Sequence, residues 1–358
     1  MDSLVRALKG AYADAWREIL AGAIAFDLLY FALGAAFYFV IYERRRSRLS
    51  VGRLPRYVVD PRLAYPAAPI DDARRSSKID RRSWLLRFLW APPLTAITTW
   101  LALPLGVYIQ GQLNAWFGAP PPVDWPKWAI LLCQVGVIFL VGDFGNYWNH
   151  RWMHRFPLYW SFHRVHHSAE TLNYFTGDRE HPLEVLPSVI IQGLFRGLGA
   201  GLVLWATGAP LISTTLPVLV ALGVLWNIRT VLYHSHVPLS FGKLDYLIGG
   251  PIMHQLHHSA EAHHFSLNFG VQLYCWDWLF GTIYVPAKGE IFRLGLGLDE
   301  LGPRNPHGTL KDLYFEPVMH AWHTLRPPKI PPTPQDQIVG PDFRPKDGGV
   351  TPLGETRK

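Results

Sequence analysis

Long apolar runs separated by polar connections dominate the hydrophobic pattern of this 358-residue chain. The first run, residues 22–42, contains one acid, Asp27, and leads into a basic stretch at residues 43–48. About 20 apolar residues in a helix span the hydrocarbon core of a bilayer, so this run predicts a transmembrane helix. An amphipathic stretch at residues 1–20 precedes it, which is not typical of a cleavable signal peptide.

Four further apolar stretches follow, at residues 85–109, 128–141, 183–205 and 211–231. Prolines and charges interrupt or border three of them: Pro92, Pro93 and Pro104 in the first, Asp143 just beyond the second, and Glu184, Pro187 and Arg196 in the third. The pattern therefore fits re-entrant or tilted segments as well as straight spans, and the predicted number of spans varies by one or two. The pattern predicts an all-α fold, a polytopic membrane helical bundle.

Loop charge predicts the orientation of these segments. Residues 43–82 are dense in arginine, whereas residues 110–127 contain one Lys and one Asp. Lys and Arg favour the cytoplasmic side, so the first connection is expected in the cytoplasm and the second outside. Successive hairpins then bring residues 150–181 and 234–264 to the cytoplasmic face. The net charge of +7 is explained by this topology and by anionic lipid headgroups, without nucleic acid.

Composition agrees with a membrane protein, since 49% of the residues are hydrophobic and 15 are Trp. The expected organisation has five parts: an amphipathic N-terminal segment (1–20), a first transmembrane helix with its basic cytoplasmic connection (21–84), a membrane-embedded domain (85–290), a C-terminal extension (291–325) and a disordered tail (326–358). The tail is rich in Pro, Gly and charge and has no apolar period.

Histidines form three spaced sets on the two segments expected at the cytoplasmic face. The sets are His150 and His154; His163, His166 and His167; and His254, His257 and His258. Residues three and four apart share a helix face, so each set can direct several imidazoles at one point, and neutral imidazole suits iron, zinc and copper. Eight nitrogens are too many for one ion. The count therefore predicts two metals close together, with positions left open for a reactant.

Local sequence places the first two sets near each other. Residues 146–154 are expected to extend the apolar helix that precedes them, and Pro157 is expected to interrupt it. Residues 158–168 then begin a new helix that bears the second set. The result is a histidine-rich helical cap over the bundle.

The three sets and their flanks resemble those of the fatty acid hydroxylase and sterol desaturase family of integral-membrane di-iron enzymes. The matching flanks are Asn146-Tyr147-Trp148, Phe162-His163, Arg179-Glu180-His181-Pro182-Leu183-Glu184, Asn268-Phe269-Gly270 and Trp276-Asp277-Trp278-Leu279-Phe280-Gly281-Thr282. The resemblance covers roughly residues 85–290. It implies a non-haem centre of two Fe ions that activates O2 and hydroxylates or desaturates a C–H bond of a sterol, fatty acyl chain or related lipid.

By this resemblance the eight histidines of the three sets are the metal ligands. His234, in Tyr233-His234-Ser235, and His181, before Pro182, fall at positions where the family has further histidines and are additional ligand candidates. His236 falls where the family commonly has Asn and is left out. His263, His264, His307, His320 and His323 are expected to be ordinary structural histidines.

Neighbouring side chains have two possible roles each. Four acids could orient imidazole N–H groups or form surface ion pairs: Asp143, Asp178, Glu180 and Glu184. Five tryptophans could line a lipid tunnel, although an interfacial aromatic belt is favoured for most: Trp148, Trp152, Trp160, Trp276 and Trp278. The glycines of residues 197–201 are best explained by close helix packing.

The chain contains no dinucleotide fingerprint, so electrons are expected from a separate protein, a ferredoxin or a cytochrome b5-like donor with its reductase. Two alternatives belong to other classes. A histidine-based membrane metal transporter would place its ligands along a path through the bilayer. A bis-His haem electron carrier would explain paired histidines but not two H-x-x-H-H clusters.

Overall fold

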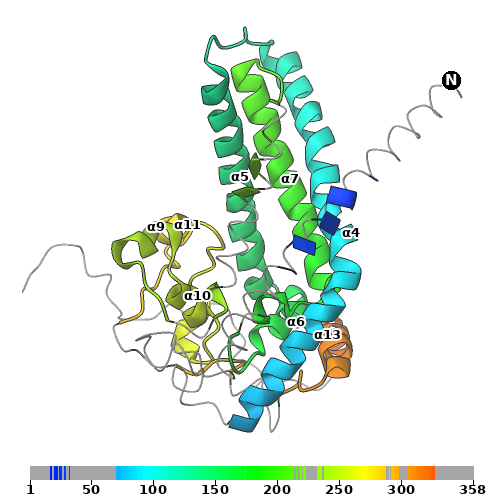
Figure 1. The fold of residues 1–358 in the computed structure, drawn as a ribbon, viewed down its shortest axis with the longest axis vertical. Coiled ribbons are helices and arrows are strands. Elements are labelled where there is room, and N and C mark those ends of the chain that lie inside the picture. Colours follow the sequence, from blue (N-terminus) through cyan, green and yellow to red (C-terminus); the bar gives the residue numbers. More distant parts are fainter. Residues whose placement is uncertain are drawn as a thin grey trace, which may run out of the picture.

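Three long helices stand side by side in this computed structural model (Figure 1). It describes residues 70–173, 175–212, 232–235, 238–287, 292–297 and 305–326, with Glu290 and isolated positions within 17–32 and 215–222. The long helices are α4 (Ile70–Phe117), α5 (Lys127–Arg155) and α7 (Pro182–Thr207). All three are long and apolar enough to cross a membrane. Only helices and one isolated bridge, between Ser259 and Leu294, occur in the described part of the chain, which confirms the predicted all-α class.

The apolar stretches at residues 85–109, 128–141 and 183–205 lie in α4, α5 and α7. Helix α4 continues through Pro92, Pro93 and Pro104, so these prolines do not interrupt it. The Thr95 hydroxyl donates to the carbonyls of Ala91 and Pro92, as Ser and Thr often do near prolines in membrane helices. The expected segments 1–20 and 22–42, the stretch 211–231 and the tail lie wholly or largely outside the described residues.

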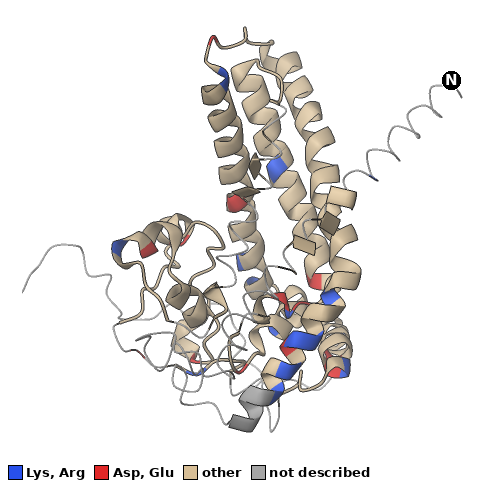
Figure 2. Cartoon of the chain, viewed as in Figure 1, with Lys and Arg blue, Asp and Glu red and all other residues tan. Residues whose placement is uncertain are grey.

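Short helices gather around one end of the three long ones (Figure 1). They are α6 (Pro157–His167), α9 (Asp245–Ile248), α10 (Pro251–His257), α11 (Cys275–Leu279), α13 (Leu310–Leu325) and the 3-10 turns η2 (Thr176–Asp178), η3 (Gly242–Leu244) and η4 (Ala262–His264). Charged residues concentrate there and are sparse along the long helices (Figure 2). This end is the predicted histidine-rich cap; its cytoplasmic orientation stays a prediction.

Prolines set the helix boundaries in the cap. Phe156 is extended, with φ −97° and ψ 118°, because the following Pro157 disfavours helical backbone in the residue before it. Pro157 then occupies the first turn of α6, where its missing N–H has no helical partner to lose. Both the extension of α5 through residues 146–154 and the break at Pro157 are confirmed. Pro182 opens α7 in the same way.

Glycines allow α7 to pack closely against both neighbours. Gly201 faces α4, where an added Cβ would lie 2.6 Å from the Ile109 Cβ and 2.9 Å from the Gly106 carbonyl oxygen. Gly199 faces α5, where a Cβ would lie 3.1 Å from the Val141 Cβ. Small residues bring helix backbones together in membranes, where lipid offers little hydrophobic driving force for association. The packing interpretation of residues 197–201 is therefore confirmed.

A buried ion pair joins α4 to the cap. Arg179 Nη1 lies 2.8 Å from Asp80 Oδ1, and both side chains are fully buried. The same guanidinium donates to the Val165 carbonyl and to the Ser168 hydroxyl at the end of α6. Asn173 donates to the other Asp80 oxygen. This cluster fixes the C-terminal end of α6, the helix that bears the second histidine set.

We expect Gly201→Ala to lower stability by about 1–3 kcal/mol, because the new methyl overpacks the α4–α7 contact. Gly136→Ala on α5 is the matched control, since nothing lies within 4 Å of its added Cβ. Alanine is a better helix former than glycine, so the control should be neutral or stabilising. Thermal unfolding of the purified protein in detergent measures both; equal effects would contradict close packing at Gly201.

We expect Asp80→Leu to cost about 3–5 kcal/mol, because it leaves the Arg179 charge buried without a counter-charge. Adding Arg179→Met to that variant should recover part of the loss, since the uncompensated charge is removed with it. The same unfolding measurement applies. A double variant whose loss equals the sum of the two single losses would show that the pair is not coupled.

Candidate metal centre

Nine histidines form two groups in the cap, each with one nitrogen per residue lying within 4.8 Å of the others. The first group consists of His150, His154, His163, His167 and His257. The second group consists of His166, His234, His254 and His258. All nine are buried except His154, which is half-buried. The structure thus brings together the eight histidines of the three spaced sets and adds His234.

Each H-x-x-H-H cluster contributes to both groups. On α6, His163 and His167 belong to the first group and His166 to the second. Helix geometry explains the division: at about 100° per residue, positions four apart point nearly the same way, and the position between them points elsewhere. In the third set the assignment is reversed, with His257 alone in the first group. The His167 and His258 rings stack across the boundary with centroids 4.5 Å apart, so the two groups are adjacent.

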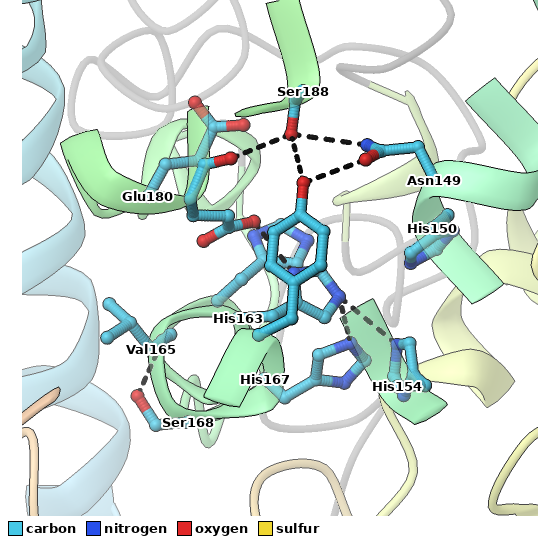
Figure 3. Close-up of polar contacts among 12 residues, drawn as sticks. Asn149, His150, His154, His163, Val165, His167, Ser168, Glu180 and Ser188 are labelled. Carbon is cyan, nitrogen blue, oxygen red and sulfur yellow. Dashed lines mark hydrogen bonds and ion pairs between the residues drawn. The ribbon is translucent and has the colours of Figure 1, made fainter. Parts of the chain in front are cut away.

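The nitrogen spacing fits metal ligation. In the first group, His163 Nε2 lies 3.1 Å from the Nε2 atoms of both His154 and His167 (Figure 3). In the second, His234 Nε2 lies 3.2 Å from His166 Nε2 and 3.0 Å from His254 Nε2. Two nitrogens about 2.1 Å from one ion, seen at a right angle, are about 3.0 Å apart. Both groups therefore fit a first-row metal ion with imidazole ligands.

Protonation agrees with this fit. Burial, reinforced by neighbouring imidazoles, lowers the pKa of six of these histidines well below the usual value: His163, His166, His167, His254, His257 and His258. An imidazole must be neutral to offer a lone pair to a metal. The His257 Nε2 atom is buried without a hydrogen-bond partner, which leaves it available as a ligand.

Contacts at the Nδ1 atom orient three imidazole rings of the first group. His150 Nδ1 donates to the Phe269 carbonyl at 2.8 Å, and His257 Nδ1 donates to the Leu267 carbonyl at 2.8 Å. His163 Nδ1 lies 2.7 Å from Glu184 Oε1. Each contact fixes the proton on Nδ1 and turns Nε2 toward the group.

Of the four predicted orienting acids, Glu184 contacts a grouped histidine, His163. Asp143 instead accepts hydrogen bonds from the Leu273 N–H and the Trp276 indole. Asp178 and Glu180 both pair with Arg87.

The sequence could not predict that the Leu267 and Phe269 carbonyls orient histidines, because every residue has a carbonyl. The loop that carries them is held by Asp277, which lies in the matching flank at residues 276–282. Asp277 is buried and accepts hydrogen bonds from the Phe269 and Gly270 N–H groups and from the Thr282 hydroxyl. Asn268, at φ 58°, donates to the Met253 and Tyr284 carbonyls. Through these bonds Asp277 and Asn268 hold the loop whose carbonyls orient His150 and His257.

His181 lies outside both groups. Its Nδ1 accepts from the Leu183 N–H at the start of α7, and its Nε2 donates to the Tyr314 carbonyl. Both nitrogens are occupied, so His181 caps a helix here. His236 lies outside the described residues.

Three of the other histidines, His264, His307 and His320, make hydrogen bonds outside the two groups. His307 pairs with Glu316, and His320 hydrogen-bonds Ser161. His264 bonds Ser259 and Glu290 and forms, with the exposed His263, a third and more peripheral histidine–carboxylate group.

A polar cluster behind the first group joins three helices: α5 and α6, which carry grouped histidines, and α7, which carries Glu184. Tyr159 of α6 donates to Asn149 Oδ1 of α5 at 2.7 Å. The Asn149 amide donates to Ser188 of α7, as Figure 3 shows. These bonds hold the ends of α5, α6 and α7 at fixed separation around the histidines.

A cavity of about 550 Å³ opens beside His154 of the first group. Its lining residues are Trp148, Arg151, Trp152, His154, Arg155, Phe156, Pro157, Ser266, Phe269 and Thr282. Of the five tryptophans considered in the sequence, Trp148 and Trp152 line this cavity. Trp160 packs on the His154 ring, with centroids 5.1 Å apart. Trp276 donates to Asp143, and Trp278 is exposed.

We expect the metal-free protein to lose stability as pH falls below about 6.5, because the unfolded histidines bind protons there and the buried ones do not. Each such histidine contributes up to about 1.4 kcal/mol per pH unit between its two pKa values. The measurement is the unfolding free energy in detergent between about pH 5 and pH 8. His166→Ala should reduce the slope and the exposed His323→Ala should not; a flat profile would contradict the burial of neutral imidazoles.

Comparison with known proteins agrees with this geometry. Residues 135–282 match the family model "Fatty acid hydroxylase". An ornithine lipid hydroxylase of Rhizobium tropici is 30% identical over 48% of this chain and 48% of its own. Human alkylglycerol monooxygenase is 27% identical over 52% of this chain and 36% of its own. A very-long-chain aldehyde decarbonylase of Oryza sativa subsp. indica is 35% identical over 50% of this chain and 62% of its own.

These matches cover between about a third and three fifths of the relatives' lengths. No solved structure is significantly similar to the chain. The matched residues 135–282 include all nine grouped histidines, the orienting Glu184 and the Asp277 loop. The resemblance inferred from the histidine sets is confirmed, since residues 135–282 match the fatty acid hydroxylase model and the similar proteins include lipid hydroxylases and monooxygenases.

Proposed function

We propose that this protein is an integral-membrane, O2-dependent lipid oxidoreductase whose two histidine groups hold a pair of iron ions. The observation that supports it most is the adjacency of two all-histidine groups at one end of three apolar helices. A transporter would need ligands along the spans, and a bis-His haem uses only two axial histidines. The groups contain five and four converging imidazoles, which favours a two-metal centre over a transporter and over a bis-His haem.

In this proposal the first ion is held by His150, His154, His163, His167 and His257, and the second by His166, His234, His254 and His258. The iron pair would supply the activation of O2. The chain's own residues orient the imidazoles and exclude water. Phe269 packs on the His154 ring with centroids 5.2 Å apart, and Trp160 covers the same ring.

Electrons must come from outside the chain. Inserting one oxygen atom of O2 into a C–H bond and releasing the other as water consumes two electrons and two protons. A ferredoxin, or a cytochrome b5-like protein with its reductase, would deliver them at the cap. The cap is proposed to face the cytoplasm, where such donors are soluble and where the arginine-rich connection at residues 43–82 is retained.

The substrate is proposed to be a lipid that approaches from the bilayer. The relatives' names cover an ornithine lipid, alkylglycerols and very-long-chain aldehydes, all with long apolar chains. The catalytic domain is proposed to extend over residues 85–290, so that α4, which packs along α7, completes the membrane part of the enzyme. Hydroxylation is proposed, with desaturation as the alternative outcome of the same chemistry.

We expect the purified protein to contain about two irons per chain. His257→Ala, in the first group, and His258→Ala, in the second, should each retain one or none, because each removes a ligand that no neighbour replaces. His323→Ala, an exposed histidine of α13, is the matched control and should retain both. Iron is measured by elemental analysis of folded protein in detergent. Full iron in both ligand variants would refute the site.

Lipid extracts of a host with and without the gene, compared by mass spectrometry, test the reaction separately. Hydroxylation appears as a gain of one oxygen and desaturation as a loss of two hydrogens. Both changes should vanish in His257→Ala and persist in His323→Ala. An iron-loaded protein that changes no lipid would contradict the oxidoreductase proposal while leaving the metal site intact.

A further inference from the structure

The cavity beside His154 combines an apolar wall with two cations. Trp148, Trp152 and Phe269 provide aromatic surface, and Arg151 and Arg155 provide charge. No acidic side chain is among the described residues that line it. A cavity for a neutral lipid has no need of two guanidinium groups, because a lone cation beside apolar surface favours an anion as its partner.

The two arginines lie four residues apart on α5 and therefore share one face of the helix. Arg151 is held in place: its Nη1 donates to the Tyr147 hydroxyl at 3.1 Å, and its guanidinium lies 5.2 Å from the centroid of the Trp148 ring. Arginine has five N–H donors, so most of those on Arg151 stay available. Arg155 is exposed and makes no hydrogen bond or ion pair with any other residue that the structure describes.

We propose that this cavity binds an amphiphile with an anionic head group, a carboxylate or a phosphate ester, on Arg155 and Arg151, with its apolar chain against Trp148, Trp152 and Phe269. The proposal names the substrate class of the site and rests on the proposed function for any oxidation. The binding itself does not require iron, so it can be tested alone. Planar guanidinium groups match both head groups through paired N–H···O bonds.

The position of the arginines also limits where oxidation occurs. Along the axis of α5, Arg155 lies about 1.5 Å and Arg151 about 4.5 Å from His154. A head group bound by these side chains therefore places the first carbons of the chain, rather than its far end, beside the first histidine group. The oxidised carbon is accordingly close to the head group.

The test is competition binding of a fluorescent fatty acid to the iron-loaded protein in phosphatidylcholine nanodiscs. The competitors are oleate, oleyl phosphate and oleyl alcohol, which share one chain, and inorganic phosphate, which has none. Oleate and oleyl phosphate should bind at least about tenfold more tightly than the alcohol, and inorganic phosphate should not compete. Arg155→Gln should remove most of this preference without changing alcohol binding, and Arg155→Lys should restore part of it.

Arg82→Gln is the matched control, since Arg82 is an exposed arginine of α4 outside the cavity lining. It should leave all affinities unchanged, which excludes a general effect of surface charge on partitioning. Equal affinity of the wild-type protein for the three oleyl compounds would overturn the inference, as would an equal loss of alcohol and oleate binding in Arg155→Gln. Iron content, measured in the same preparations, separates this failure from failure of the proposed metal centre.

Discussion

The structure depends on holding nine imidazoles in contact inside the cap, where several of their nitrogens have no hydrogen-bond partner other than one another. A buried polar atom without a partner costs about 1–3 kcal/mol, so this arrangement is unfavourable unless something binds it. Charging the rings does not relieve the cost, because burial and mutual repulsion keep their pKa values low. A metal ion does relieve it, since each lone pair gains a bond. This cost is a further argument that the two groups bind metal, and the remaining structure must then hold the nine rings in place.

Three separate sets of contacts hold the rings in place. Glycine contacts on α7 let α4 and α5 approach it closely, and the Arg179–Asp80 pair then fixes the end of α6 against α4. The Asp277 carboxylate shapes the loop whose carbonyls orient His150 and His257. These residues act on the two histidine groups through the backbone and helices that carry them. Each would alter these groups if removed, because ligand geometry depends on the rigidity of the surrounding shell.

The sequence predicts the parts of this arrangement that follow a period or a motif. Apolar runs locate α4, α5 and α7, Pro157 locates the break before α6, and the spacing of histidines identifies eight of the nine grouped residues. It does not predict how they divide, because assignment of His166 and His257 to opposite groups depends on the relative rotation of α6 and α10. The sequence also gives His181 and His234 equal standing as additional ligand candidates, although His181 caps α7 in the structure. Local sequence cannot distinguish a cap from a ligand when both require the same ring.

The two groups differ in a way that connects the metal centre to the cavity. In the first, His150, His163 and His257 have their Nδ1 atoms engaged by two carbonyls and a carboxylate. In the second, the Nδ1 atoms of His166, His254 and His258 are buried without partners. Outer partners fix ring orientation and raise ligand basicity, so the first group is the more rigid and the stronger donor set. The cavity meets this group, at His154, so in the proposed function the lipid would approach the better-ordered half of the centre.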